Sequence, residues 1–319
     1  MYRIGIDLGG TNIAAGLVNE NYQIVRKDSV PTNAQRDPAL IVDDIAMLCK
    51  KLCAGEGLQI ADIEAIGIAS PGIANHDDGV VEYANNLPFR KFAICDMLRE
   101  RTGVKNIHVE NDANAAAWGE AVAGAAKGTK KSVMITLGTG VGGGIIIDGK
   151  VFSGFNYAGG ELGHTVIEKD GAPCSCGRKG CWEAYSSATA LIRMTKEKMA
   201  ECKAAGRETL LEKISAEKGK VSGKTAFDAM RAGDEAGKEV VDKYLAYLAT
   251  GLGNMINIFQ PEVISLGGGV SNERENLLKP LIPLVRQEQY GGDLVSLTKI
   301  CIAELGNDAG IIGAAFLGI

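Results

Sequence analysis

The chain has 319 residues, of which 46% are hydrophobic and 23% charged, a composition typical of globular proteins. Its length predicts two domains or lobes, and its net charge of −5 argues against a nucleic-acid-binding surface. No apolar run reaches the roughly 18 residues of a membrane span, and the apolar N-terminal run contains Asp7, unlike a signal peptide. We therefore expect a cytoplasmic protein.

The first residues predict a β-hairpin with a glycine tip. Strands are expected over 2–8 and 13–18, on either side of Gly9-Gly10-Thr11. Glycines at such a tip let backbone N–H groups approach phosphate oxygens, and Asp7 could hold Mg²⁺ directly or through water. The pattern lacks the GxxxxGK[ST] of a P-loop, so a plain hairpin without a ligand remains an alternative.

A polar cluster lies further along, between a strand expected over 107–109 and a helix of small residues. Before it, apolar spacing predicts a helix over 38–53, a strand over 63–69, a loop from 70 to 88 and a helix over 94–101. The cluster, Glu110-Asn111-Asp112-Ala113-Asn114, stands where open α/β sheets place catalytic groups. Helix capping alone would justify one acid or amide, but two amides beside Asp112 exceed that need, so we favour a functional role.

A second glycine-tipped hairpin repeats the opening pattern. Strands are expected over 132–137, 145–147 and 151–152, with glycines concentrated at 138–144. Two similar hairpins predict a duplicated lobe whose glycine tips contact one phosphate chain from either side. A glycine-rich loop without a ligand is the alternative, but it does not explain why glycines interrupt good strands.

Three of the eight cysteines lie close together as Cys174-x-Cys176-x4-Cys181, and His164 stands ten residues upstream. Three thiolates and one imidazole form the closed tetrahedral set that a structural Zn²⁺ prefers. A disulfide or buried thiols are the alternatives, although a disulfide is disfavoured in a chain without a secretion signal. A metal would hold a loop that presents Glu161, His164 and Glu183 to a polar ligand.

The rest of the chain is expected to be mostly helical. Helices are expected over 183–202, 225–233, 235–259 and 308–317, a charged helix or loop over 203–224, and strands over 263–266 and 298–303. Between these strands stand Gly267-Gly268-Gly269, which could admit a flat ring or a ribose, followed by a loop.

Together these motifs resemble the ROK family of sugar kinases, in the actin/Hsp70/hexokinase superfamily. The matching motifs are DLGGT at 7–11, ENDAN at 110–114, LGTGVGGG at 137–144, GELGH at 160–164, CSCGRKGCWE at 174–183 and PEVISLGGG at 261–269. The resemblance implies an α/β fold of two ribonuclease H-like lobes around an interlobe cleft. It assigns 1–115 to the N-terminal lobe, completed by a C-terminal helix at 306–319, and 116–305 to a C-terminal lobe with the zinc loop.

The resemblance also implies roles for individual residues. Asp112 matches the catalytic base. The implied zinc ligands are His164, Cys174, Cys176 and Cys181. The implied sugar contacts are Asn86 (or Asn85), Asn111, Asp112, Glu161, His164 and Glu183. The implied contacts to Mg-ATP are Asp7, Gly9, Gly10, Thr11, Asn12, Gly138, Thr139, Gly140, Gly267, Gly268 and Gly269.

The implied activity is ATP-dependent phosphorylation of a hexose at the 6-hydroxyl by a homo-oligomer, dimer or tetramer. Glucose is the first candidate, N-acetylglucosamine or N-acetylmannosamine the next, and polyphosphate remains open as a donor. The family's sugar-responsive transcriptional regulators carry an N-terminal helix-turn-helix, which we do not expect here because the first strand starts at Tyr2. A third class is an actin- or Hsp70-like ATPase without a sugar, which Glu161, His164 and Glu183 disfavour.

Overall fold

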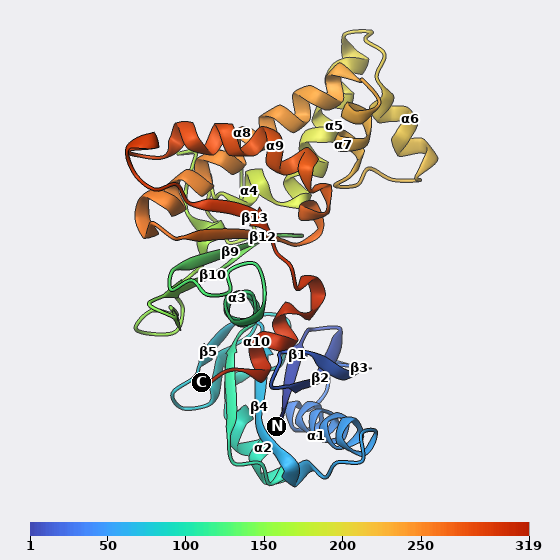
Figure 1. Cartoon of the computed structure of the whole chain (residues 1–319). Coiled ribbons are helices and arrows are strands. Elements are labelled where there is room, and N and C mark those ends of the chain that lie inside the picture. Colours follow the sequence, from blue (N-terminus) through green and yellow to red (C-terminus); the bar gives the residue numbers. More distant parts are fainter. Residues whose placement is uncertain (319) are drawn as a thin grey trace. The chain divides into compact units, whose positions relative to one another are not determined.

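The computed structural model describes residues 1–318 (Figure 1). The chain divides into two compact units. Unit 1 contains Met1–Met134, Gly144–Gly160 and the C-terminal segment from Glu304, and unit 2 contains Ile135–Gly143 and Glu161–Ala303. Helix α3 (Asp112–Ala123) lies wholly in unit 1, so the boundary between the units falls later in the chain than residue 115.

The central sheet of unit 1 has five strands in the order β3-β2-β1-β4-β8. These are β1 (Tyr2–Leu8), β2 (Asn12–Asn19), β3 (Ile24–Pro31), β4 (Ile63–Ser70) and β8 (Ile107–Asn111). The first three form an antiparallel meander, whereas β4 and β8 run parallel to β1. Because parallel strands end at one edge of a sheet, the residues that follow β1 and β8 lie along the same edge, where α/β sheets bind ligands.

Helices cover both faces of this sheet. On one side α1 (Pro38–Ala54) and α2 (Ile94–Thr102) bury a large aliphatic core. On the other side α10 (Ala309–Ala315) packs against β1, β4 and α3 (Figure 1). The backbones approach so closely that a Cβ at Gly5 would lie 1.8 Å from the carbonyl oxygen of Ile311. The C-terminal helix therefore requires glycine on the strands beneath it.

Residues 70–88 were expected to be loop, and this expectation is wrong for part of the segment. A separate antiparallel sheet is formed by β5 (Ile73–Asn75), β6 (Val80–Tyr83) and β7 (Arg90–Phe92). Its strands are only three or four residues long. Strands this short are too brief to show the alternation by which a strand is recognised in a sequence.

A second five-stranded sheet has the order β11-β10-β9-β12-β13. Its strands are β9 (Ser132–Leu137), β10 (Val141–Ile147), β11 (Lys150–Val151), β12 (Val263–Gly267) and β13 (Lys299–Ile302). In both sheets the first strand lies at the centre, its hairpin partner and the next strand lie on one side, and the later strands lie on the other. The two sheets therefore share one topology, as expected of a duplicated lobe.

Unit 2 is largely helical. Its helices are α4 (Glu183–Ser186), α5 (Ala188–Ala204), α6 (Leu210–Glu217), α7 (Thr225–Arg231), α8 (Glu235–Phe259) and α9 (Glu275–Glu288). Helices α8 and α9 pack side by side (Figure 1). Short 3-10 helices occupy Ile60–Asp62, Leu162–His164, Gly269–Glu273, Gly292–Leu294 and Gly306–Asp308. Across residues 1–318, no helix has the length and apolar character needed to cross a membrane.

Two helical predictions in unit 2 are wrong. The single helix expected over 183–202 is broken at Ser187, whose ψ of 164° is extended and whose hydroxyl oxygen caps α5 by accepting from Ala190 N. The loop expected after Gly269 contains α9, which holds Pro280 and Pro283 inside it. Proline disfavours a helix interior, so the helix was overlooked, although its apolar side packs on α8.

Candidate functional site

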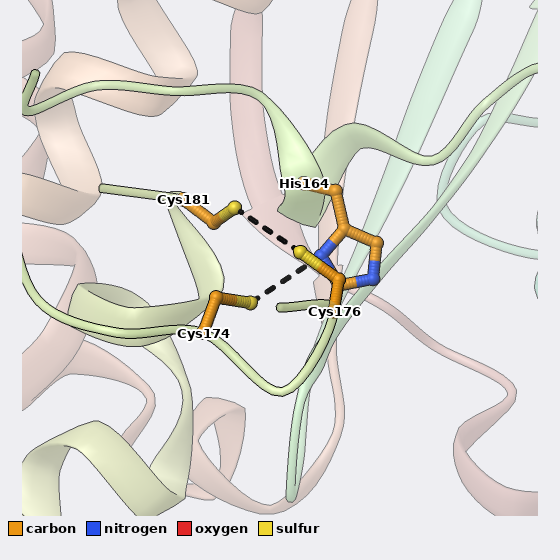
Figure 2. Close-up of side chains that lie close together, drawn as sticks. All are labelled: His164, Cys174, Cys176 and Cys181. Carbon is orange, nitrogen blue, oxygen red and sulfur yellow. Dashed lines mark hydrogen bonds between the residues drawn. The ribbon is translucent and has the colours of Figure 1, made fainter. Parts of the chain in front are cut away.

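The four predicted metal ligands lie together in unit 2 (Figure 2). Their ligand atoms are all within 4.8 Å of one another. Cys174 Sγ is 3.6 Å from His164 Nδ1, and Cys176 Sγ is 3.6 Å from Cys181 Sγ. In a tetrahedral zinc site with Zn–S bonds near 2.3 Å, neighbouring sulfurs are separated by roughly 3.8 Å. The donor chemistry and the spacing both fit Zn²⁺.

The backbone of the cysteine loop explains why these side chains converge. Gly177 and Gly180 both have positive φ, +85° and +79°, and a Cβ at Gly180 would lie 1.7 Å from the carbonyl oxygen of Glu168. The loop is closed by a hydrogen bond from Cys174 N to the carbonyl oxygen of Arg178, 2.9 Å. A tight turn of this kind needs glycine where the chain reverses.

The thiols of the cluster differ in acidity. A hydrogen bond from the Arg178 backbone is the main cause that lowers the pKa of Cys176 to about 7. Desolvation is the main cause that raises the pKa of Cys174 to about 11. The Arg178 guanidinium donates to the carbonyl oxygen of His164 and approaches Cys181 Sγ. Of these two thiols, Cys176 is therefore the one whose thiolate, the form that binds a metal, is favoured.

His164 and Glu161 are positioned by a short 3-10 helix, Leu162–His164. Glu161 stands at its N-cap position, and His164 N donates to the Glu161 carbonyl oxygen at 3.0 Å. Because Nδ1 of His164 faces Cys174, the ring presents its other nitrogen away from the cysteine cluster (Figure 2). A metal on Nδ1 would fix the orientation of that second nitrogen.

Glu183 connects the cysteine loop to the second glycine tip. Its Oε2 accepts from Val141 N at 3.1 Å, and its Oε1 accepts from the Ser175 hydroxyl at 3.0 Å. Its neighbour Trp182 is fully buried against α8, where a Cβ at Gly251 would lie 2.0 Å from the indole. Ser175 was overlooked in the sequence, since a serine between two cysteines looks like a spacer. The Cys-Ser-Cys pattern itself was the available signal.

Asp112 is the first residue of α3 and is exposed. The cap of this helix is its neighbour Asn111, whose Oδ1 accepts from Ala113 N and Asn114 N. The Asn111 amide also donates to the carbonyl oxygen of Gly72 at 3.0 Å. Capping therefore accounts for Asn111, whereas Asp112 is not the capping residue.

The first glycine tip lies at the same sheet edge as Asp112. Asp7 pairs with Ala69 on β4, and Ser70 in turn pairs with Asn111 on β8. A Cβ at Gly10 would lie 3.0 Å from Asn86 Cβ, so Asn86 is in direct contact with the tip. Its neighbour Asn85 instead accepts a hydrogen bond from the Tyr83 hydroxyl. The geometry therefore places Asn86, rather than Asn85, beside Gly9–Asn12.

Asp7 itself is partly buried behind this tip. Burial raises the pKa of its carboxyl group, and the positive charge of Lys27 opposes the shift. A Cβ at Gly310 would lie 3.4 Å from its Cγ, so α10 closes one side of the carboxyl group. A cation bound nearby would offset the cost of desolvating this carboxylate.

The second glycine tip and the triple glycine adjoin each other in unit 2. Gly267 ends β12, and Gly268 has a φ of +81°. A Cβ at Gly268 would lie 2.6 Å from the carbonyl oxygen of Leu137, the residue before Gly138. Glycine at 268 thus lets two loop segments pack backbone to backbone.

A cavity of about 430 Å³ in unit 2 is bordered by the tip and by the cysteine loop. Its lining includes Thr139, Gly140, Cys174, Ser175 and Glu183. Of the predicted site residues, unit 1 thus holds Asp7, Gly9–Asn12, Asn86, Asn111 and Asp112, and unit 2 holds the remainder.

Known proteins similar to this chain agree with these features. The family model of the ROK family matches residues 3–319 of this chain. A glucokinase of Halalkalibacterium halodurans is 40% identical over 318 residues, covering 98% of this chain and 94% of the relative. An N-acetyl-D-glucosamine kinase of Aliivibrio salmonicida is 32% identical over 328 residues, covering 99% of each.

A solved structure confirms the expected fold. The ROK family glucokinase of Streptomyces griseus, crystallised with glucose and AMPPNP, is 36% identical and superposes with a TM-score of 0.78 over 99% of both chains. The prediction of an α/β fold of the ribonuclease H-like, actin-type class is therefore correct. Because the family model spans residues 3–319 and the motifs of the family are present, the chain belongs to the ROK family.

Proposed function

We propose that this protein phosphorylates glucose at the 6-hydroxyl with ATP, giving glucose 6-phosphate. The observation that carries the proposal is the cavity in unit 2 bordered by both the glycine tip Thr139-Gly140 and the cysteine loop with Glu183. One surface thus offers backbone groups suited to phosphate and side chains suited to hydroxyls. The 40% identity to a glucokinase supports glucose as the acceptor.

Asp112 is the proposed general base. A carboxylate is a much weaker base than an alkoxide, so it accepts the 6-hydroxyl proton only as the new oxygen–phosphorus bond forms. Phosphoryl transfer passes through a loose transition state, in which positioning and charge neutralisation supply most of the catalysis. The N-terminus of α3 stabilises negative charge on Asp112.

The proposed sugar contacts divide between the two units. Asn86, Asn111 and Asp112 belong to unit 1, whereas Glu161, His164 and Glu183 belong to unit 2. Each unit therefore contributes polar side chains to the proposed sugar contacts. Carboxylates, amides and an imidazole suit this task because they pair with hydroxyl groups as acceptors and donors.

The proposed nucleotide contacts are the two glycine tips and Gly267-Gly268-Gly269. Mg²⁺, when bound, would neutralise charge on the phosphates, and we propose that the partly buried carboxyl group of Asp7 faces it, directly or through water. His164, Cys174, Cys176 and Cys181 would hold Zn²⁺ with four protein ligands, which would leave no open position for chemistry. Its proposed task is to hold His164 and the loop that carries Ser175.

Two alternatives follow from the comparisons. N-acetylglucosamine, or its epimer N-acetylmannosamine, is the second acceptor to test, because an N-acetyl-D-glucosamine kinase shares 32% identity. A non-catalytic sugar-sensing regulator is the alternative of another class. We further propose a cytoplasmic location, since the eight cysteines form no disulfide within residues 1–318. We also propose a homo-oligomer, as the family resemblance implies.

The deciding experiment measures ADP release from Mg-ATP in a coupled assay, with each of a panel of sugars as the acceptor. Glucose is expected to give the highest kcat/KM, followed by N-acetylhexosamines. Release of glucose 6-phosphate identifies the acceptor oxygen. Sugar binding without ADP release would favour the regulator, and ADP release that is independent of any sugar would favour a simple ATPase.

A further inference from the structure

Each glycine tip is braced by a threonine that lies far from it in the sequence. In unit 1, the Thr32 hydroxyl donates to the carbonyl oxygen of Gly9 at 2.6 Å. The backbone N–H of the same residue donates to the carbonyl oxygen of Thr11 at 2.9 Å. Thr32 is fully buried, so both bonds are shielded from water.

Unit 2 shows the same pair of bonds with different residues, although Thr189, unlike Thr32, is exposed. The Thr189 hydroxyl donates to the carbonyl oxygen of Thr139 at 2.7 Å. The adjacent Ala188 N–H donates to the carbonyl oxygen of Gly138 at 2.8 Å. Both donors stand in the first turn of α5, immediately after its cap Ser187. In both units, then, one hydroxyl and one N–H hold two carbonyl oxygens of the tip.

The amide groups of the tips are left available. The first glycine of each tip turns its N–H back into the loop, Gly9 to the Asn12 oxygen and Gly138 to the Gly140 oxygen. Among residues 1–318, no protein acceptor pairs with the backbone N–H groups of Gly10, Thr11, Thr139 and Gly140. A phosphate is attracted to such N–H groups and repelled by carbonyl oxygens. The hydrogen bonds to the carbonyl oxygens therefore fix the orientation of the peptide groups, so that a phosphate at the tip meets their N–H groups.

We propose that Thr32 and Thr189 are positioning residues for Mg-ATP, each of which orients the peptide groups of one glycine tip toward the phosphates. The inference rests on the proposed function, because it concerns the same nucleotide site. Neither threonine needs to contact the nucleotide, since each acts through carbonyl oxygens of the tip. Catalysis by positioning depends on such preorganised groups.

The test replaces each threonine by valine, which keeps the shape and removes the hydroxyl. For Thr32→Val and Thr189→Val we expect the KM for Mg-ATP and the Kd for Mg-ADP, measured by calorimetry, to rise about three- to tenfold. The KM for glucose is expected to stay within about twofold. Thr32→Ser and Thr189→Ser keep the hydroxyl and are expected to restore nucleotide affinity.

Matched controls remove equivalent bonds elsewhere. The Thr298 hydroxyl donates to the carbonyl oxygen of Pro261 at 2.7 Å in unit 2, and the Thr102 hydroxyl donates to that of Leu98 at 2.8 Å in unit 1. Thr298→Val and Thr102→Val are expected to lower the melting temperature comparably without changing affinity for Mg-ATP or Mg-ADP.

The outcomes separate this inference from the proposed function. Valine variants with unchanged nucleotide affinity, or an equal rise in the KM of both substrates, would overturn the positioning role. Serine variants as impaired as the valine variants would overturn it too. A wild-type protein without kinase turnover would instead refute the proposed function, while Mg-ADP calorimetry still reports on the two threonines.

Discussion

The carboxylate of Glu183 lies within hydrogen-bond distance of the backbone N–H of Val141, with 3.1 Å between Oε2 and N. Its other oxygen accepts from the Ser175 hydroxyl. One side chain therefore joins the residue that follows the second glycine tip to the loop that carries the predicted metal ligands. A residue expected only to contact a sugar also holds two loops together.

We predict that Glu183→Gln weakens glucose binding and turnover together. The glutamine side chain has the same size, but it has only one acceptor oxygen and no charge. It therefore cannot accept from both Val141 N and the Ser175 hydroxyl. Hydrogen bonds to a charged group contribute about 1.5–3 kcal/mol, so kcat/KM is expected to fall roughly 10- to 100-fold. Steady-state kinetics measures the loss. Exposed Glu197 on α5 provides the control Glu197→Gln, and equal kinetics for both variants would contradict the prediction.

Asp112→Asn is expected to preserve the fold and Mg-ATP binding while lowering kcat. Loss of a general base costs about 10²- to 10⁴-fold in rate. The matched control is Asp96→Asn, which removes an exposed carboxylate from the first turn of α2. Circular dichroism and single-turnover kinetics distinguish loss of chemistry from loss of structure. Near-normal turnover by Asp112→Asn would reject the base assignment.

Removal of the metal is expected to lower both stability and sugar affinity. Cys176→Ser, or chelation, deprives the cluster of a ligand, and metal-binding free energy is folding free energy in such loops. The orientation of His164 is lost as well, so the KM for glucose is expected to rise about tenfold or more. Metal content, melting temperature and KM are measured on one sample, with Cys301→Ser as the control. A zinc-free sample with normal melting and normal KM would count against the assignment.

Gly67→Ala is expected to destabilise unit 1. A Cβ at this position would lie 1.7 Å from the carbonyl oxygen of Ala314 in α10, where backbone cannot yield easily. Overpacking of this kind costs about 3 kcal/mol, which corresponds to roughly 5–10 °C in melting temperature. The control is Gly223→Ala, where the nearest atom is 3.6 Å away. Similar melting temperatures for Gly67→Ala and Gly223→Ala would contradict this prediction and show that α10 can shift to make room for the added methyl group.

His76 is expected to make stability depend on pH. A hydrogen bond from Nδ1 to Glu110, 3.1 Å, is the main cause that raises the pKa of His76. The pair therefore stabilises the fold below about pH 6.5, and the contribution fades as pH rises through the folded-state pKa. Wild type should thus melt at a higher temperature than His76→Gln, and this difference in melting temperature should be larger at about pH 5 than at about pH 9.

His108 provides the opposite control, because burial, aided by Arg3 and Arg99, lowers the pKa of its imidazole. Its protonation at low pH favours the unfolded chain, so His108→Gln should gain stability relative to wild type as pH falls. Equal pH profiles for the two variants would refute both attributions.

The features predicted well from the sequence are those encoded within short stretches. The hairpins at Gly9-Gly10-Thr11 and Gly138-Thr139-Gly140 follow from strand alternation interrupted by glycine. The expected extent of the second tip, 138–144, is wrong, because β10 already begins at Val141 and includes the last three glycines of that run. The gathering of Cys174, Cys176 and Cys181 follows from their spacing and from the glycines between them. In these cases the residues that determine the structure are also neighbours along the chain.

The features that the sequence did not reveal depend on partners far away in the chain. Helix α9 tolerates Pro280 and Pro283 because packing on α8 stabilises it. The side-chain amide of Asn111 donates to the carbonyl oxygen of Gly72, which lies 39 residues earlier in the chain. No local pattern links these residues to their partners.

By itself, the sequence determined the two glycine tips, the Cys3His set and the family, because each is written in contiguous or closely spaced residues. Only the tertiary structure decided that Glu183 pairs with Val141, that Asn86 adjoins Gly10, and that Thr189 holds the carbonyl of Thr139. Such contacts form between atoms that packing brings together. The sequence does not show which distant group a given hydroxyl, amide or carboxylate will contact.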